Sequence, residues 1–114
     1  VQGVAAAYRM TATLAYERGY PATVNSPEET SLSAAVAGSL VGSGNVHAEH
    51  PPCMGAEDFA FMLQKRPGSY IWMGQGGGPE GRVCHSPFYD FNDEVLPLGA
   101  SYWVRLVEHL LPRP

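Results

Sequence analysis

Apolar residues recur at helical spacing between residues 26 and 42, and the same stretch has the polar signals that start and stop a helix. Ser26 is a typical N-cap, Pro27 suits the first helical position, and Glu29 completes a capping box three residues after the cap. Gly42 is a natural C-terminal stop. The apolar positions follow an i, i+3, i+4, i+8 pattern and are Leu32, Ala35, Val36 and Leu40. The pattern therefore predicts a helix in this stretch.

A second strong helical pattern lies near the C-terminal end. It begins near Pro97 and has a broad apolar face, made of Tyr102, Trp103, Leu106, Val107, Leu110 and Leu111. Two shorter stretches also favour helix. Residues 3–8 do so through their alanines, and residues 55–63 do so because their acidic start suits the electropositive end of a helix.

Residues that favour β-structure dominate three further stretches. Residues 11–18 alternate partly between apolar and polar positions, residues 45–48 form a short candidate strand, and residues 69–74 are a nearly continuous aromatic and β-branched run. Turn-forming residues fill positions 19–25. Because helices and strands alternate after that turn-rich stretch, the pattern predicts an α/β architecture with a linker at residues 19–25.

Composition and charge exclude two classes of partner. The chain has 114 residues, enough for one modest core, and a net charge of -4 with a pI near 5.4. This acidic chain has no basic stripe for nucleic acid, and no apolar run approaches the ~18 residues of a membrane-spanning helix. Two cysteines do not form a disulfide framework, so we expect a reducing, cytoplasmic setting. The sequence leaves a Cys53–Cys84 bridge open.

His85 is the strongest candidate for chemistry. It lies in the aromatic, acid-rich stretch 83–94, where Pro87 biases the residue before it toward extended geometry and so favours a fixed loop. A neutral imidazole on such a loop suits zinc, nickel, iron or copper. A metal site usually has three or four protein ligands, however, and no His-Glu-x-x-His or Cys-x-x-Cys spacing supplies the others.

The other candidates favour plainer interpretations. His47 and His50 would share one face of a helix, but the two prolines directly after them favour an extended polar loop. His109 lies in the last predicted helix, where an imidazolium interacts favourably with the helix dipole. The glycine run that begins at Gly74 lacks the Gly-Lys-Ser/Thr of a phosphate-binding loop, so it predicts a surface loop.

Three groups of motifs, and their order along the chain, are similar to those of one enzyme family. They are Gly19-Tyr20-Pro21 with Val24-Asn25, then Met54-Gly55-Ala56-Glu57-Asp58-Phe59, then His85-Ser86-Pro87 with Tyr89-Asp90-Phe91-Asn92-Asp93-Glu94 and Leu96-Pro97-Leu98-Gly99-Ala100. Together they resemble the C-terminal part of metal-dependent amidohydrolases. This family comprises hippurate hydrolases, N-acyl-amino-acid amidohydrolases and plant auxin-conjugate hydrolases, and is related to the dinuclear metallopeptidases of carboxypeptidase type.

The resemblance implies an α/β fold, namely the C-terminal part of a mixed-sheet metallopeptidase catalytic domain, preceded by the end of a ferredoxin-like lid domain. Residues 1–18 would then end the lid, residues 19–25 would be the linker, and residues 26–114 would be the C-terminal portion of the catalytic domain. Because the lid often makes the dimer contact in this family, we expect a homo-oligomer.

The resemblance also implies a site of which this chain holds one part. His85 matches the family's C-terminal metal-ligand histidine. The family uses two divalent ions (zinc, manganese or nickel) and a glutamate general base to activate water against a small N-acyl amino acid. The other ligand motifs and the general base belong to N-terminal sequence that this chain lacks. The chain alone is therefore expected to contribute no catalytic residue and to bind no metal stably.

Three neighbouring candidates receive other roles. Glu57 and Asp58 match a family motif at a helix start near the active-site cleft, where we expect them to cap backbone or orient ligands rather than bind metal. Cys84 directly precedes His85. In extended chain the two side chains would point to opposite sides, so we do not expect Cys84 to bind the same metal as His85.

Two functional hypotheses remain. The first is a fragment of an amidohydrolase that is inactive alone, and the second is a stand-alone, non-catalytic α/β binding or assembly module. The alanine-rich start, which is typical of the end of a helix, and the incomplete ligand set favour the first.

Overall fold

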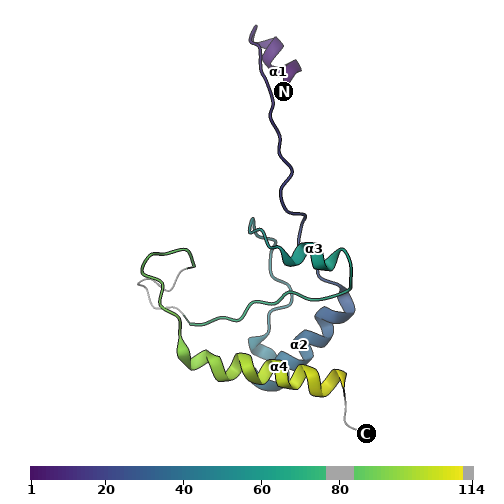
Figure 1. The fold of residues 1–114 in the computed structure, drawn as a ribbon, viewed down its shortest axis with the longest axis vertical. Helices are drawn as coiled ribbons and strands as arrows, with labels where there is room; N and C mark the ends of the chain where they lie inside the picture. The colour runs from purple at the N-terminus through teal and green to yellow at the C-terminus, as the bar shows by residue number, and fades with distance from the viewer. Residues whose placement is uncertain (77–83, 112–114) are drawn as a thin grey trace.

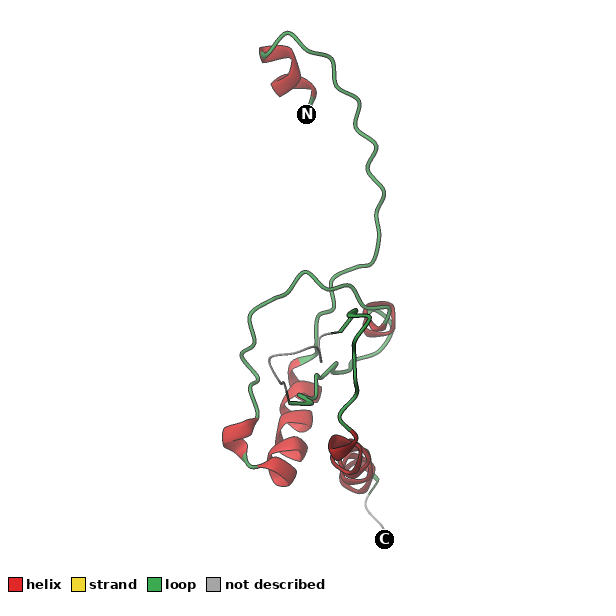
Figure 2. Cartoon of the chain, turned by 90° about the vertical axis from the view of Figure 1, so that its left-hand side faces the viewer, coloured by secondary structure: helices red, strands yellow, loops and turns green. Residues whose placement is uncertain are grey.

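The computed structural model describes residues 1–76 and 84–111 (Figure 1). Its elements are α1 (Gln2–Ala7), α2 (Pro27–Val41), η1 (Ser43–Asn45), α3 (Phe59–Leu63), η2 (Asp93–Val95) and α4 (Leu96–Leu110), in which η marks a 3₁₀ turn. The described residues contain helices and loops but no strand (Figure 2). No helix in this part of the chain is both long and apolar enough to cross a lipid bilayer.

The helices form a small body from which the N-terminal segment projects. Figure 1 shows α1 at the far end of an extended segment, α2 and α4 close together, and α3 between them and the extended segment. Helices α2 and α4 pack against each other. Each helix contributes one buried apolar residue, and these are Ala5, Val36, Ala60 and Tyr102. The core of the described chain is therefore small, and only Val36 and Tyr102 lie on helices that pack against each other.

Helix α2 confirms the predicted bounds, but the predicted capping box is wrong. Ser26 is the N-cap and Gly42, with φ 82°, follows the last turn. The Ser26 Oγ accepts a hydrogen bond from the backbone N–H of Gly68 at 3.1 Å and makes no cap within its own helix. Of the predicted apolar face, Val36 is buried and Ala35 is exposed. Ser26 thus joins α2 to a distant segment instead of closing its own first turn.

The other helices agree with the prediction in position but not always in length. Helix α4 begins one residue before the predicted start at Pro97 and ends at Leu110. Helix α1 covers most of the predicted residues 3–8. Helix α3 begins only at Phe59, whereas residues 55–63 were predicted to be helical. Gly55 has a low helix propensity, and Asp58 occupies the N-cap position, so the helix starts late.

The three predicted strands are wrong for the described chain. Residues 11–18 and 69–74 are irregular, and Asn45 lies in η1 rather than at the start of a strand. A strand is defined by its backbone hydrogen bonds to a neighbour, and none of these segments has a neighbouring strand in the part described. The mixed sheet of the expected α/β fold is therefore not confirmed.

Candidate functional site

The His85 side chain lies on an exposed turn between the glycine run and α4. His85 has φ 69°, a left-handed backbone conformation that histidine adopts more readily than most residues but still at a cost of about 1 kcal/mol. The turn after it is tied by Ser86, whose carbonyl accepts from the Tyr89 N–H at 3.1 Å and whose Oγ accepts from the Phe88 N–H at 3.1 Å. The imidazole is thus presented to solvent from hydrogen-bonded backbone.

Residues on both sides of the glycine run are joined by hydrogen bonds. The Asn92 Nδ2 donates to the Gln75 carbonyl at 2.8 Å, and the Gln75 Oε1 accepts from the Tyr89 hydroxyl at 3.1 Å and from the Asn92 N–H at 3.4 Å. Figure 1 shows the segment that contains Gln75 running from α3 toward the loop before α4. These bonds connect that segment to the loop that carries His85. Part of the glycine run, residues 77–83, lies outside the described residues.

The same segment is also held at its other end. The Asn25 Oδ1 accepts from the Tyr70 N–H at 2.8 Å, and the Asn25 Nδ2 donates to the Tyr70 carbonyl at 2.9 Å. Two asparagines therefore hold residues 68–76, one just before α2 and one just before α4. The sequence predicts neither role. The sequence indicates Asn25 only as part of the linker and of the family motif, and Asn92 only as part of that motif.

The described residues contain no group of three side chains suited to hold a metal ion. His50 lies edge-on to Trp72, with ring centroids 5.2 Å apart, so it takes part in an aromatic contact. Cys53 and Cys84 are both free thiols and both exposed. The described residues thus do not by themselves supply a complete two-metal centre, and the ligand role of His85 stays a prediction.

Glu57 and Asp58 lie at the start of α3, as predicted, with Glu57 half-buried beside Tyr70. Burial raises the pKa of the Tyr70 hydroxyl above 10.0, and a hydrogen bond with the Glu57 carboxylate raises this pKa further. A hydrogen bond with Trp72 lowers it. Asp58 adds a smaller repulsion in the same direction as Glu57. The structure thus places both carboxylates near a tyrosine, and their role toward a metal ligand stays a prediction.

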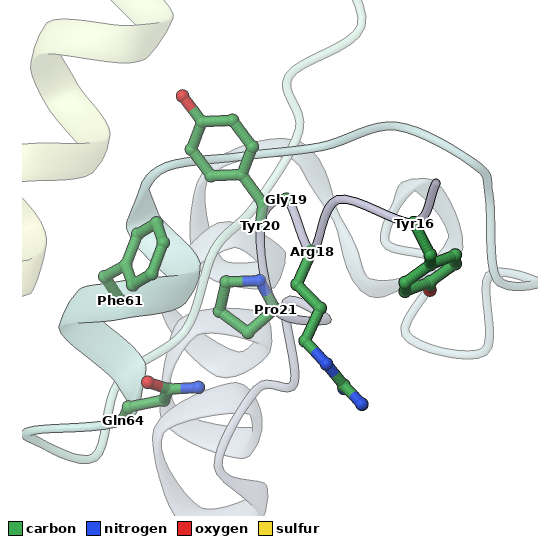
Figure 3. A pocket seen from close by; sticks show the side chains of 7 residues that line it. All are labelled: Tyr16, Arg18, Gly19, Tyr20, Pro21, Phe61 and Gln64. Carbon is green, nitrogen blue, oxygen red and sulfur yellow. The ribbon is translucent and has the colours of Figure 1, made fainter. Parts of the chain in front are cut away.

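An open hollow of about 350 Å³ lies where the predicted linker meets α3. Its lining consists of Tyr16, Arg18, Gly19, Tyr20, Pro21, Phe61 and Gln64. Figure 3 shows the rings of Tyr20 and Phe61 side by side and Arg18 extending away from them, and the ring centroids are 5.6 Å apart. Among the described residues, the lining includes no histidine, cysteine or carboxylate, so that part of the hollow offers none of the usual metal ligands.

Comparisons with known proteins place the chain in a family. The model of the peptidase family M20/M25/M40 matches residues 4–109. The chain is 36% identical to the IAA-amino acid hydrolase ILR1-like 4 of Arabidopsis thaliana over 72% of its own length and 19% of that protein. It is 35% identical to the N-acetylcysteine deacetylase of Bacillus subtilis over 92% of its own length and 26% of that protein.

A third relative is the hippurate hydrolase of Campylobacter jejuni, which is 31% identical over 75% of this chain and 22% of its own length. The chain thus spans about a fifth to a quarter of the length of these relatives. No solved structure matches it significantly. The family resemblance seen in the sequence motifs is confirmed, because this chain belongs to the peptidase family M20/M25/M40.

Proposed function

We propose that this chain is the C-terminal part of a metal-dependent amidohydrolase that cleaves small N-acyl amino acids of the hippurate type. His85 supplies one ligand to a pair of divalent ions, zinc, manganese or nickel, which when bound would lower the pKa of a water molecule and polarise the amide carbonyl. The other ligands and the glutamate general base come from polypeptide outside this chain.

The same proposal assigns the parts of the chain. Residues 1–18 end a lid domain, residues 19–25 are the linker, and residues 26–114 close the catalytic domain. The separation of α1 from the body, along an extended segment, fits this division. Glu57 and Asp58 serve near the cleft as capping or orienting groups and not as metal ligands.

One observation carries the proposal: the family match includes an exposed histidine on a hydrogen-bonded turn. The relatives are named as hydrolases or a deacetylase, and their named substrates are amides of amino acids. An exposed imidazole without a hydrogen-bond or ion-pair partner in the described chain keeps a nitrogen available for a metal.

The second candidate is a stand-alone, non-catalytic binding or assembly module. It is favoured by the observation that the described residues provide no complete group of metal ligands. The greater length of the relatives supports the first candidate, because a two-metal site can draw its other ligands from the additional polypeptide.

The test uses the complete polypeptide encoded by the gene, loaded with zinc or manganese, and measures glycine release from hippurate. We expect His85→Ala to lower kcat/KM by more than about 100-fold, the upper end of what losing a supporting group costs a metal site. His109→Ala is the matched control, because His109 is an exposed histidine in the last turn of α4 and should leave activity unchanged.

Three results would contradict the proposal. Equal activity of the His85→Ala and wild-type enzymes would remove the ligand role. Turnover of hippurate by the metal-loaded 114-residue chain alone would show that no outside ligands are needed. A complete polypeptide that hydrolyses neither hippurate nor any other N-acyl amino acid would favour the binding module.

A further inference from the structure

Gln75 and Asn92 bind each other through both backbone and side-chain atoms, although they are 17 positions apart. The Asn92 amide donates to the Gln75 carbonyl, while the Gln75 amide oxygen accepts from the Asn92 backbone and the Tyr89 hydroxyl. His85 lies between the two residues in sequence. The Gln75–Asn92 pair therefore joins the segment that contains Gln75 to the end of the stretch 84–92 that carries His85.

The neighbours of Asn92 require an asparagine rather than another side chain. Its Oδ1 accepts from the Glu94 N–H at 3.2 Å, at the start of η2, while its Nδ2 donates to the Gln75 carbonyl. A flipped amide would place two donors together on one side and two acceptors together on the other. Aspartate lacks the donor and leucine lacks both groups, so each would break at least one side of this arrangement.

We propose that Asn92 is a positioning residue that fixes the His85 loop for metal binding, an inference that rests on the proposed function. His85 has a backbone conformation that persists only where the surroundings hold it. Most residues of the loop from Cys84 to Phe91 are exposed, so burial contributes little to that hold.

Asn92 couples the loop to two firmer parts of the structure. One is the segment that ends at Gln75, which Asn25 holds at Tyr70. The other is η2 and the fifteen-residue α4 that follows it directly. A metal ligand has to stay within about 0.5 Å of its productive position, and hydrogen bonds to rigid elements provide that precision.

The test compares Asn92→Asp with wild type in the complete polypeptide. Aspartate keeps the acceptor for the Glu94 N–H but sets an oxygen against the Gln75 carbonyl. Its added negative charge would attract a cation, so a loss of metal affinity would come from the loss of positioning and not from the charge. Zinc affinity is measured by competition with a chromophoric chelator, and loop order is measured by amide hydrogen exchange at residues 84–92.

Asn45→Asp is the matched control. The Asn45 Nδ2 donates to the Val41 carbonyl at 2.7 Å, an amide-to-backbone bond of the same kind at the far end of α2. We expect Asn92→Asp to weaken zinc binding about tenfold and to speed exchange at residues 84–92, and Asn45→Asp to do neither.

The outcomes separate the two proposals. If His85→Ala abolishes zinc binding but Asn92→Asp behaves like Asn45→Asp, the positioning role is wrong and the proposed function stands. If His85→Ala leaves zinc binding unchanged, the proposed function fails and the positioning role fails with it. Should Asn92→Asp not fold, Asn92→Ala removes both side-chain hydrogen bonds without adding a charge, and Asn45→Ala is its control. Equal zinc affinities of Asn92→Ala and Asn45→Ala would then overturn the inference.

Discussion

Replacing Asn25 by alanine tests whether one side chain holds the segment of residues 68–76 in place. The Asn25 amide makes two hydrogen bonds to Tyr70, at 2.8 Å to its N–H and 2.9 Å to its carbonyl, across 45 residues of sequence. One side chain thus pairs with both backbone groups of a residue, as a neighbouring strand would. Alanine leaves both of these half-buried groups without that partner.

The expected magnitude follows from the two lost bonds. Each hydrogen bond of this kind contributes about 1 kcal/mol net, so Asn25→Ala should reduce the stability of the segment by about 2 kcal/mol. This corresponds to roughly 30-fold faster exchange of the Tyr70 amide hydrogen where exchange reports local opening. Asn25→Asp keeps the acceptor for the Tyr70 N–H but sets an oxygen against the Tyr70 carbonyl, so it should also speed exchange at Tyr70.

Native-state amide exchange, followed by NMR in the complete polypeptide, measures this at Tyr70 directly. Asn45→Ala is the control. It removes an exposed hydrogen bond of 2.7 Å, from the Asn45 side-chain amide to the Val41 carbonyl, in another part of the molecule, and should leave the exchange of the Tyr70 amide unchanged. The reasoning is refuted if Asn25→Ala and Asn45→Ala give the same Tyr70 exchange rate. Other contacts would then hold the segment.

Three further predictions concern electrostatics, backbone strain and association. Glu57→Gln should lower the raised pKa of Tyr70 toward 10, which the absorbance of the phenolate measures. Because the folded-state pKa of Tyr70 is raised, the contribution of Tyr70 to the free energy of unfolding is complete below about pH 10. This contribution is lost as the pH rises through the raised pKa, and urea midpoints measured across that range check the loss. Gly42→Ala should lower the free energy of unfolding by about 1 kcal/mol, because Gly42 has φ 82°. Gly99→Ala in α4 should raise it by up to about 1 kcal/mol, because alanine has a higher helix propensity and the new Cβ meets only the flexible end of a methionine. Thermal melts measure both changes. Val107→Glu, on an exposed apolar part of α4, should reduce self-association of the 114-residue chain in light scattering, and a wild-type chain that stays monomeric at high concentration would contradict this.

The helices could be predicted because their signals are local. Ser26, Pro27 and Gly42 set the ends of α2 through the backbone of adjacent residues, and the helix begins and ends where they indicate. The capping box failed because the Ser26 hydroxyl had a competing partner, the Gly68 N–H, 42 positions away. Local chemistry therefore gave the bounds of the helix but not the partner of its cap.

The site could be predicted only in part for the same physical reason. A histidine before Ser86-Pro87 is a recognisable motif, and the structure places it on a hydrogen-bonded turn. The supporting asparagines have partners 17 and 45 residues away, and no spacing rule identifies such pairs. A polar residue just before a helix indicates a cap, and it does not reveal that the amide serves a distant backbone.

The failed strand prediction and the incomplete ligand set have a common explanation in the proposed function. Residues 69–74 have the composition of a strand covered on both faces, yet Ile71, Trp72 and Met73 are 40%, 59% and 43% exposed. Exposed apolar side chains of this kind need other side chains to cover them, and a His85 imidazole that binds metal as proposed needs further ligands. The relatives are about four to five times as long as the part of them that this chain matches. If the additional polypeptide pairs with residues 69–74, the same contact would brace Gln75, and through Asn92 it would bring the His85 loop beside the remaining ligands. Sheet formation and metal binding would then depend on each other.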